Sequence, residues 1–289
     1  MNYSVVIISY FSEHLIRGIL KNFDENTEII IIENSKDEKF KINIEKNYRN
    51  VKVVIPEYNL GFGPGVNHGV KLSKNDYVLC IVSDVELSKL TIDSLSDCIE
   101  KFKNFAIIAP TFSNEKIYKN YFLSSKKKNL ENSVALKYDI KEVDSVDGAG
   151  FIINKPIIEK VGYLDENFFF YFELEDLCLR LNKQNQKIYV CDKIKFYHKG
   201  LASSHSTKLA KVKILRNWHY CWGKFYFYKK HYGYFFGLKK TIPNFIRAIK
   251  YIILSIIKNK PDELKMHKAE LNGLLNSYLL KKSSFRLPE

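Results

Sequence analysis

Short runs of Val and Ile recur along the first part of the chain and alternate with polar stretches. The runs cover residues 4–10, 28–32, 51–55, 77–82 and 105–109. Because these runs are apolar at consecutive positions, each is expected to be a strand covered on both faces, as in a parallel sheet. Residues 12–22 and 89–103 carry apolar side chains at helical spacing. Strands that alternate with helices predict a doubly wound α/β core.

The rest of the chain follows a different pattern. Residues 113–142 are polar and rich in Lys and Asn, without periodicity, which favours a long loop or a small insertion. A second structured block is expected over residues 143–198. The segment from about residue 205 to the end is aromatic and basic. We therefore expect two domains, residues 1–204 and residues 205–289.

Composition places the chain among globular proteins, and its charge is unevenly distributed. Of 289 residues, 46% are hydrophobic, which excludes wholesale disorder. The net charge is +14, and 16 of the 46 Lys and Arg residues lie between Asp192 and Asp262, where no acidic residue occurs. The five cysteines are widely spaced without a CxxC pair, so neither a disulfide framework nor a zinc site is expected, and a reducing cytosol is favoured. The first apolar run is too short for a signal peptide or membrane anchor.

Candidate chemistry follows the predicted strands, because ligands of open α/β sheets bind at the carboxyl ends of the strands. Glu33 follows the second strand and could accept hydrogen bonds from a base or ribose, or belong to an ordinary polar loop. Residues 59–69 hold several glycines, which permit close backbone approach to a ligand or a tight turn before a helix. Asp84 follows the fourth strand and could bind a divalent cation or cap a helix.

An acidic cluster follows an aromatic run at residues 168–172. Glu173, Asp176 and Arg180 are three and four residues apart, so a helix would place them on one face, with Asp176 and Arg180 able to pair. The same pattern is typical of an ordinary amphipathic helix with a capped start. The cluster alone leaves both interpretations open.

Seven motifs in this order resemble the family 2 inverting glycosyltransferases with the GT-A fold. The likeness is greatest to the rhamnosyltransferase-like branch that builds bacterial surface polysaccharides, and it covers about residues 3–236. The motifs are VVIISY at 5–10, IIENS at 31–35, NLGFG with NHG at 59–69, SDV at 83–85, GYLDENFF at 162–169, DLCLRL at 176–181 and HKG at 198–200. The resemblance implies a mixed doubly wound α/β sheet of the GT-A type, with a C-terminal helical, basic and aromatic extension.

The resemblance also implies a set of site residues. The nucleotide-sugar donor site would comprise Ser9, Tyr10, Glu33, Asn59, Gly61, Gly63, Asn67, Ser83 and Asp84. The acceptor site would comprise Gly148, Asp165 and Glu166. Asp84 and His198 would bind a divalent cation, Mg²⁺ or Mn²⁺, although Val82 replaces the preceding ligand of the family's DxD-like element. The catalytic base would be Glu173, with Glu175 and Asp176 as competitors because Leu174 replaces the second acid of the family's pattern.

The implied activity is transfer of a hexosyl or deoxyhexosyl group, with inversion, from a UDP- or dTDP-linked donor to a hydroxyl of a lipid-linked glycan or lipopolysaccharide precursor. Two alternatives stay open. A sugar-nucleotide pyrophosphorylase would be expected to carry a glycine-rich loop beside the first strand, where residues 9–12 have no glycine. A non-catalytic membrane-associated scaffold that binds nucleotide sugar or glycan is motivated by Val82 and Leu174.

The basic aromatic segment suggests a membrane surface as partner. Eleven aromatic residues fall between Trp218 and Phe236, and Lys250 interrupts the apolar stretch at 239–258, which is therefore too short to span a bilayer. Apolar and basic residues together are typical of interfacial helices. A helical hairpin packed on the core is the structural alternative. No nucleic-acid partner is expected, because no recognised binding module is present, and we expect a cytoplasmic protein peripheral to the inner face of the membrane.

Overall fold

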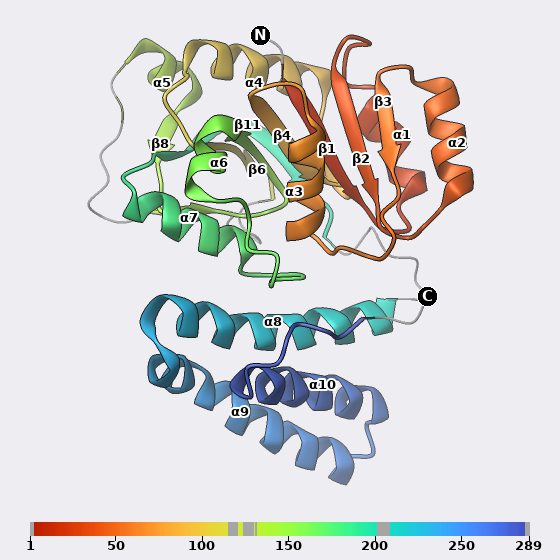
Figure 1. Cartoon of the computed structure of the whole chain (residues 1–289), viewed down its shortest axis with the longest axis vertical. Coiled ribbons are helices and arrows are strands. Elements are labelled where there is room, and N and C mark those ends of the chain that lie inside the picture. The colour runs from red at the N-terminus through yellow and green to blue at the C-terminus, as the bar shows by residue number, and fades with distance from the viewer. Residues whose placement is uncertain (1–2, 115–120, 124–129, 131, 201–208, 287–289) are drawn as a thin grey trace. The chain divides into compact units, whose positions relative to one another are not determined.

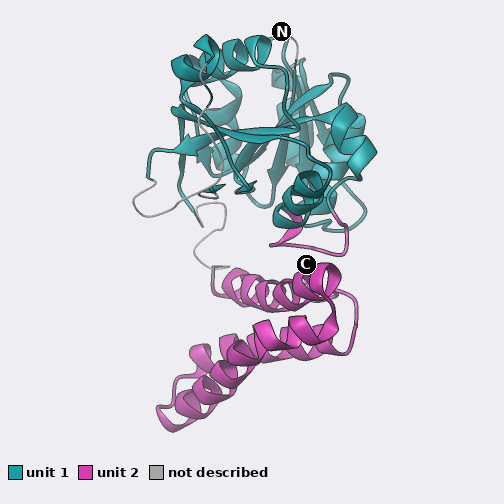
Figure 2. Cartoon of the chain, turned by 90° about the vertical axis from the view of Figure 1, so that its left-hand side faces the viewer, with its two compact units in different colours: residues 1–164, 174–203 teal, residues 165–173, 204–289 magenta. Residues whose placement is uncertain are grey.

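The computed structural model describes residues 3–114, 121–123, 130, 132–200 and 209–286. The chain divides into two compact units, distinguished by colour in Figure 2. Unit 1 comprises residues 1–164 and 174–203, and unit 2 comprises residues 165–173 and 204–289. The short segment 165–173 thus interrupts unit 1 in the sequence, because it belongs to the C-terminal helical unit.

Unit 1 contains a nine-stranded mixed sheet with the order β3-β2-β1-β4-β10-β6-β11-β5, and β8 pairs with β11 (Figure 1). Its strands are β1 Ser4–Ser9, β2 Glu28–Glu33, β3 Val51–Val54, β4 Tyr77–Val82, β5 Val85–Glu86, β6 Ile107–Phe112, β8 Ile140–Glu142, β10 Gly150–Asn154 and β11 Ile188–His198. Strands β3, β2, β1 and β4 are parallel, and β10 runs antiparallel to both β4 and β6. A separate two-stranded sheet pairs β7 Tyr121–Phe122 with β9 Ser145–Val146.

The helices of unit 1 connect and cover these strands. They are α1 Glu13–Leu20, α2 Glu38–Asn47, α3 Gly63–Leu72, α4 Lys89–Lys101, α5 Ser133–Tyr138, α6 Lys155–Val161 and α7 Glu173–Lys183, of which Glu173 itself belongs to unit 2. Helix α3 lies in front of the sheet in the view of Figure 1 and contacts β1 and β2. A Cβ atom on Gly69 of α3 would lie 2.4 Å from Cγ1 of Val6, so only glycine allows this close approach of helix and sheet.

The architecture confirms the expected doubly wound mixed α/β sheet and its C-terminal helical extension. All six residues of β1 are buried, as the uninterrupted apolar run predicted. The expectation of a loop or insertion across residues 113–142 was partly wrong, because α5 and β8 form near its end. Asn132 caps α5 by accepting a hydrogen bond from the Ala135 amide at 2.8 Å. Residues 115–120, 124–129 and 131 of that stretch lie outside the described residues.

The described part of unit 2 is built mainly on α8 Leu209–Tyr232, α9 Tyr234–Ile257 and α10 Pro261–Tyr278. Trp218, Trp222 and Phe225 of α8 are buried within this unit. The Trp218 indole donates a hydrogen bond to Asn272 Oδ1 at 2.7 Å, and the Trp222 indole donates to the Lys281 carbonyl at 3.0 Å. Much of the aromatic content of α8 therefore forms the core of the helical unit. Among the described helices, none combines the length and the apolar character that crossing a membrane requires.

Candidate functional site

The parallel strands β1, β2 and β4 end at one edge of the sheet. Strand β1 lies between β2 and β4, so the chain continues to one side of β1 with β2 and to the other side with β4. Such a switch point is the usual ligand site of open α/β sheets. The structure brings Ser9, Glu33 and Ser83 to this edge, each at or directly after a strand end. Tyr10 follows β1 and packs edge to face on Phe11, with ring centres 4.6 Å apart.

The carboxylate of Glu33 is held by groups from two strand ends. Ser9, its register partner on β1, donates a hydrogen bond to Oε2. The amide and the hydroxyl of Ser35 both donate to Oε1, the amide at 2.8 Å. Glu33 is only 2% exposed. The carboxylate thus ties the ends of β1 and β2 together, and its contact with a nucleotide base stays a prediction.

Asn34 orders the glycine-containing loop that precedes α3. Its Oδ1 accepts a hydrogen bond from the Leu60 amide at 3.0 Å, and its Nδ2 donates to the Gly61 carbonyl at 3.2 Å. Asn59 Oδ1 accepts from the Gly61 amide at 2.9 Å, and Gly61 has a φ of 80°. The turn requires this left-handed conformation, which glycine adopts readily. Sequence reasoning gave Asn34 no role, although its position directly after a strand end was a usable signal.

Three further predicted residues, Asn67, Gly63 and Gly148, also lie in unit 1. The side-chain amide of Asn67 donates to the Leu164 carbonyl at 2.8 Å, and its oxygen accepts from the Leu164 amide at 3.1 Å. Asn67 therefore anchors the chain before residue 165. Gly63 is buried at the start of α3. A Cβ atom on Gly148 would lie 3.0 Å from the Phe62 ring, so Gly148 lies against the loop that Asn34 orders.

Asp84 and His198 come together beside the end of β4. Nε2 of His198 lies 3.4 Å from Oδ1 of Asp84, and both residues are largely buried. The two-stranded pairing of β5 with β11 sets this distance, because His198 is the register partner of Val85 and the Lys199 amide donates to the Asp84 carbonyl at 3.0 Å. Asn114 Nδ2 donates to the His198 carbonyl at 3.0 Å. The two residues predicted to bind the cation are thus neighbours in space although 114 positions apart in sequence.

The donor set of this pair fits a divalent cation that takes its remaining ligands from elsewhere. Mg²⁺ and Mn²⁺ use few protein ligands when phosphate oxygens and water complete the coordination shell. Within the described part of the chain, no group of three or more His, Cys, Asp and Glu residues could hold a metal ion. Glu86 forms an ion pair with Lys199 at 2.6 Å, and Val82 packs against the core. Asp84 and His198 could therefore supply two ligands to such a cation, and this role stays a prediction.

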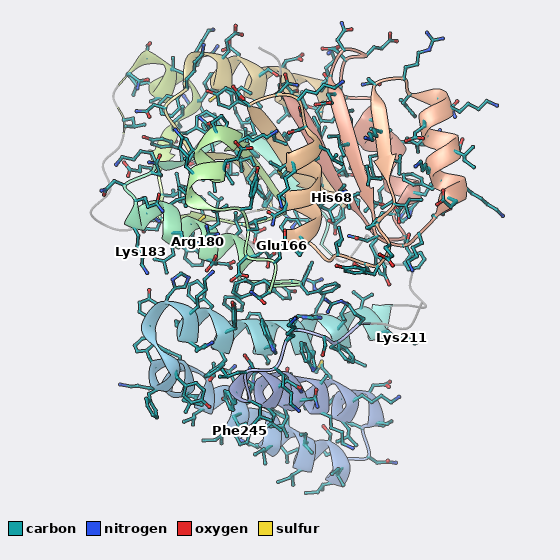
Figure 3. All side chains as sticks on the ribbon, in the orientation of Figure 1. His68, Glu166, Arg180, Lys183, Lys211 and Phe245 are labelled. Carbon is teal, nitrogen blue, oxygen red and sulfur yellow. The ribbon has the colours of Figure 1, made fainter. Side chains whose placement is uncertain are left out.

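The acidic cluster is divided among three environments on α7. Glu173 is the first residue of the helix and is 6% exposed, whereas Glu175 is exposed. Asp176 is fully buried and forms an ion pair with Arg180, whose Nε lies 2.9 Å from Oδ2. Arg180, labelled in Figure 3, also donates to the carbonyls of Val161, Gly162 and Tyr163 at 3.0, 2.6 and 2.6 Å. Asp176 thus holds the guanidinium that fixes the turn at residues 161–163.

The segment 165–173 packs within the helical unit. Asp165 Oδ2 accepts hydrogen bonds from Lys230 Nζ at 2.8 Å and from the Tyr226 hydroxyl at 3.1 Å, both on α8. Burial opposes ionisation of Asp165, but the Lys230 ammonium and the amide donors of Asn167 outweigh it and hold the pKa of this carboxyl below its ordinary value. Glu166 is exposed (Figure 3). The acceptor role predicted for both residues remains a prediction, and Asp165 has a clear structural role in unit 2.

Solved structures of glycosyltransferases share this fold. The mannosyltransferase PcManGT from Pyrobaculum calidifontis, in complex with GDP-Man and Mn²⁺, has a TM-score of 0.57 at 9% identity and covers 97% of this chain and 88% of its own. TarS residues 1–349 from S. aureus, in complex with UDP-GlcNAc, has a TM-score of 0.52 at 15% identity, covering 97% and 93%. These likenesses confirm the GT-A glycosyltransferase fold.

Sequence comparison agrees with the fold. Residues 4–162 match the family model described as glycosyl transferase family 2, and the chain belongs to that family. A curated relative, the low-salt glycan biosynthesis hexosyltransferase Agl10 of Haloferax volcanii, is 25% identical over 206 residues. That alignment covers 68% of this chain and 66% of the relative, just under two thirds of its length.

Proposed function

We propose that this protein transfers a hexosyl or deoxyhexosyl group from a nucleotide-diphosphate donor to a hydroxyl group of a lipid-linked glycan or lipopolysaccharide precursor, with inversion. The observation that carries the proposal is the Asp84–His198 pair at the switch-point edge of a glycosyl transferase family 2 domain. UDP- and dTDP-linked sugars are the proposed donors. The complex of TarS with UDP-GlcNAc supports a nucleotide-sugar donor, and membership of the rhamnosyltransferase-like branch remains a prediction.

In this proposal the donor occupies the edge formed by β1, β2 and β4. Ser9, Glu33 and Asn34 keep that edge rigid, so that the loop at residues 59–62 presents a fixed backbone to the nucleotide. Asp84 and His198 would hold a divalent cation, which when bound supplies positive charge to the departing diphosphate. The Mn²⁺ complex of the Pyrobaculum mannosyltransferase supports a divalent cation beside the donor.

Glu173 is the proposed catalytic base. A single displacement requires one carboxylate that accepts the proton of the acceptor hydroxyl as its oxygen attacks the anomeric carbon. The bond to the diphosphate oxygen then breaks, the nucleoside diphosphate leaves, and the anomeric configuration inverts. Among the three candidate acids, Asp176 is bound to Arg180 and Glu175 is exposed, which favours the largely buried Glu173.

We also propose that the acceptor is lipid-linked and that the protein acts on the inner face of the cell membrane. The basic, acid-free sequence between Asp192 and Asp262 supports this location, and the glycan-biosynthesis relative supports a glycan acceptor. All five cysteines are buried free thiols, in accord with a reducing compartment.

The test is nucleoside diphosphate release from a panel of UDP-, dTDP- and GDP-sugars, with Mg²⁺, Mn²⁺ or chelator, and with or without a membrane lipid extract. Release from one donor that increases with the lipid extract and with metal is the expected result. Folded protein that binds a nucleotide sugar but releases nothing from any donor would contradict transfer and favour the non-catalytic scaffold.

A further inference from the structure

Helix α9 has an inverted distribution of side chains. The face that it turns toward the other helices of unit 2 carries small or polar residues, namely Gly237, Thr241, Ala248 and Ser255. A Cβ atom on Gly237 would lie 2.9 Å from the ring of Phe225 on α8. The Thr241 hydroxyl donates to the Gly237 carbonyl at 2.8 Å and lies 3.0 Å from the hydroxyl of Tyr278. Close packing of α9 in this unit thus depends on small side chains.

The large apolar side chains of α9 lie on its exposed side. We call this row the isoleucine stripe, and it consists of Phe235, Ile242, Ile246, Ile249, Ile253, Ile256 and Ile257. Spacings of three, four and seven residues place these side chains on one face of a helix. Phe235 is 84% exposed and Ile257 is 74% exposed. At 1.5 Å per residue the stripe runs for about 33 Å, far longer than an isolated exposed isoleucine would explain.

A row of basic residues accompanies the isoleucine stripe. This basic flank consists of Lys239, Lys240, Arg247, Lys250 and Lys258. All five are exposed, and a helical turn of 100° per residue places them beside the stripe on one side, away from the buried face. The sequences of α8 and α9 contain no Asp or Glu. An extended apolar surface therefore has a cationic border along its whole length.

We propose that the isoleucine stripe and the basic flank form a docking surface for an anionic lipid bilayer, with α9 lying in the plane of the interface. Isoleucine and phenylalanine side chains would enter the acyl boundary, where burial of apolar area is favourable. The four lysines would meet lipid phosphates, each contributing about 1 kcal/mol near an anionic surface. Arg247 lies beside them and also pairs with Glu270, 3.8 Å away. A second copy of this chain fits less well, because pairing two such faces would bring cationic borders near each other.

The docking surface rests on the membrane location proposed above and assigns it to one face of α9. It can be tested apart from the transfer reaction, since vesicle binding requires neither donor nor acceptor. The experiment uses the full chain and measures co-flotation with vesicles of phosphatidylcholine alone or of phosphatidylcholine mixed with phosphatidylglycerol. The stripe variant combines Ile246→Asn with Ile253→Asn, and the flank variant combines Lys250→Gln with Lys258→Gln. Because these side chains are exposed, both variants should keep the wild-type circular dichroism spectrum.

Matched controls come from unit 1. Ile42→Asn with Leu90→Asn removes two apolar side chains of 67% and 77% exposure, and Lys46→Gln with Lys103→Gln removes two exposed charges. We expect the wild type to bind anionic vesicles. The affinity for these vesicles should fall by about tenfold or more in the stripe variant and by roughly tenfold in the flank variant. The control variants should bind as the wild type does, and added salt should weaken binding.

A site-specific probe supplies a second measurement, which reports which side chain enters the bilayer. Because the five native cysteines are buried, Ile253→Cys can be labelled selectively with an environment-sensitive fluorophore, with Ile42→Cys as the control. A blue shift on anionic vesicles at Ile253→Cys alone supports docking through α9. Three results would overturn the proposal: no vesicle binding by the wild type, equal losses in stripe and control variants, or a dimer in sedimentation that the stripe variant abolishes.

Discussion

Arg216 of α8 donates a hydrogen bond from Nε to the phenolic oxygen of Tyr171 over 2.6 Å. Tyr171 and the next residue, Phe172, have φ values of 71° and 72°, which bulky residues rarely adopt. Such conformations cost roughly 1–3 kcal/mol each and persist where the surroundings impose them. The Phe172 ring packs on Tyr220, with ring centres 5.3 Å apart. Helix α8 therefore fixes the backbone that directly precedes Glu173.

Tyr171→Phe and Arg216→Gln are expected to reduce kcat about fivefold, because loss of one hydrogen bond of about 1 kcal/mol lets this segment relax. As positioning residues they should leave the KM for the donor unchanged. Steady-state kinetics measures both parameters, with Lys213→Gln, which removes an exposed charge of α8, as the matched control. A rise in donor KM with an unchanged kcat would assign the pair to binding instead.

The sequence predicted the sheet well because its strands are buried on both faces and therefore apolar at consecutive positions. The run at residues 28–32 became β2 Glu28–Glu33, and that at 77–82 became β4 Tyr77–Val82. Short elements within a polar stretch escaped prediction, as α5 Ser133–Tyr138 illustrates, since six residues carry too little periodicity.

The candidate site was harder to predict, because polar side chains that bind ligands and those that brace the backbone have the same composition. Asn67 and Asp165 both lie in the family motifs. In the structure, however, Asn67 forms hydrogen bonds with the backbone of Leu164, and Asp165 accepts a hydrogen bond from Lys230. The family resemblance led us to expect Asp84 and His198 at one site. The pairing of β5 with β11 that brings them together was not predictable, because a strand of two residues leaves no pattern in the sequence. The inverted faces of α9 likewise become apparent only once the packing of Gly237 is known.

Glu173→Gln should lower kcat by about 10² to 10⁴, the usual contribution of a positioned general base. Glu175→Gln is the matched control, because it makes the same change at an exposed position of the same helix and should keep most activity. Titration calorimetry with the nucleoside diphosphate should show unchanged binding in both variants. Normal turnover by Glu173→Gln would remove Glu173 from the mechanism.

Asp84→Asn should raise the Mn²⁺ concentration needed for half-maximal turnover by roughly tenfold, since a neutral amide is a weaker ligand for a hard cation than a carboxylate. His198→Ala should act in the same direction. Electron paramagnetic resonance of Mn²⁺ in the presence of nucleoside diphosphate measures the metal affinity without turnover. Glu86→Gln is the control, because Glu86 lies two residues along the chain and forms an ion pair with Lys199. Equal Mn²⁺ affinity in Asp84→Asn and the wild type would refute the assignment.

Asp176→Asn is expected to destabilise the protein by about 3 kcal/mol, because it removes the fully buried partner of the Arg180 guanidinium and leaves that largely buried charge without an ion pair. Urea unfolding followed by circular dichroism measures the change. Glu263→Gln breaks the exposed pair with Lys260 and should cost about 1 kcal/mol or less. If Asp176→Asn kept wild-type stability but lost turnover, Asp176 would be a better candidate for the base than Glu173.

The helical unit should lose stability in acid through His219. Burial, aided by the Arg286 charge, lowers the pKa of this imidazole to about 3, against 6.5 for the unperturbed group. Its hydrogen bond to the Phe285 carbonyl acts in the opposite direction. Between these values the unfolded chain binds a proton that the folded chain does not. Stability is therefore complete above pH 6.5 and falls as the pH drops toward 3, by at most about 1.4 kcal/mol per pH unit.

Tryptophan fluorescence isolates this effect, because the two tryptophans of the chain, Trp218 and Trp222, both lie in unit 2. Urea unfolding followed by this signal at several pH values should give a steeper pH dependence for the wild type than for His219→Gln. The control is His68→Gln, which changes an exposed histidine of α3 (Figure 3) and should leave the wild-type dependence intact. An identical pH dependence in His219→Gln and the wild type would show that His219 is not the titrating group, so that acid would have to act on another group in the helical unit.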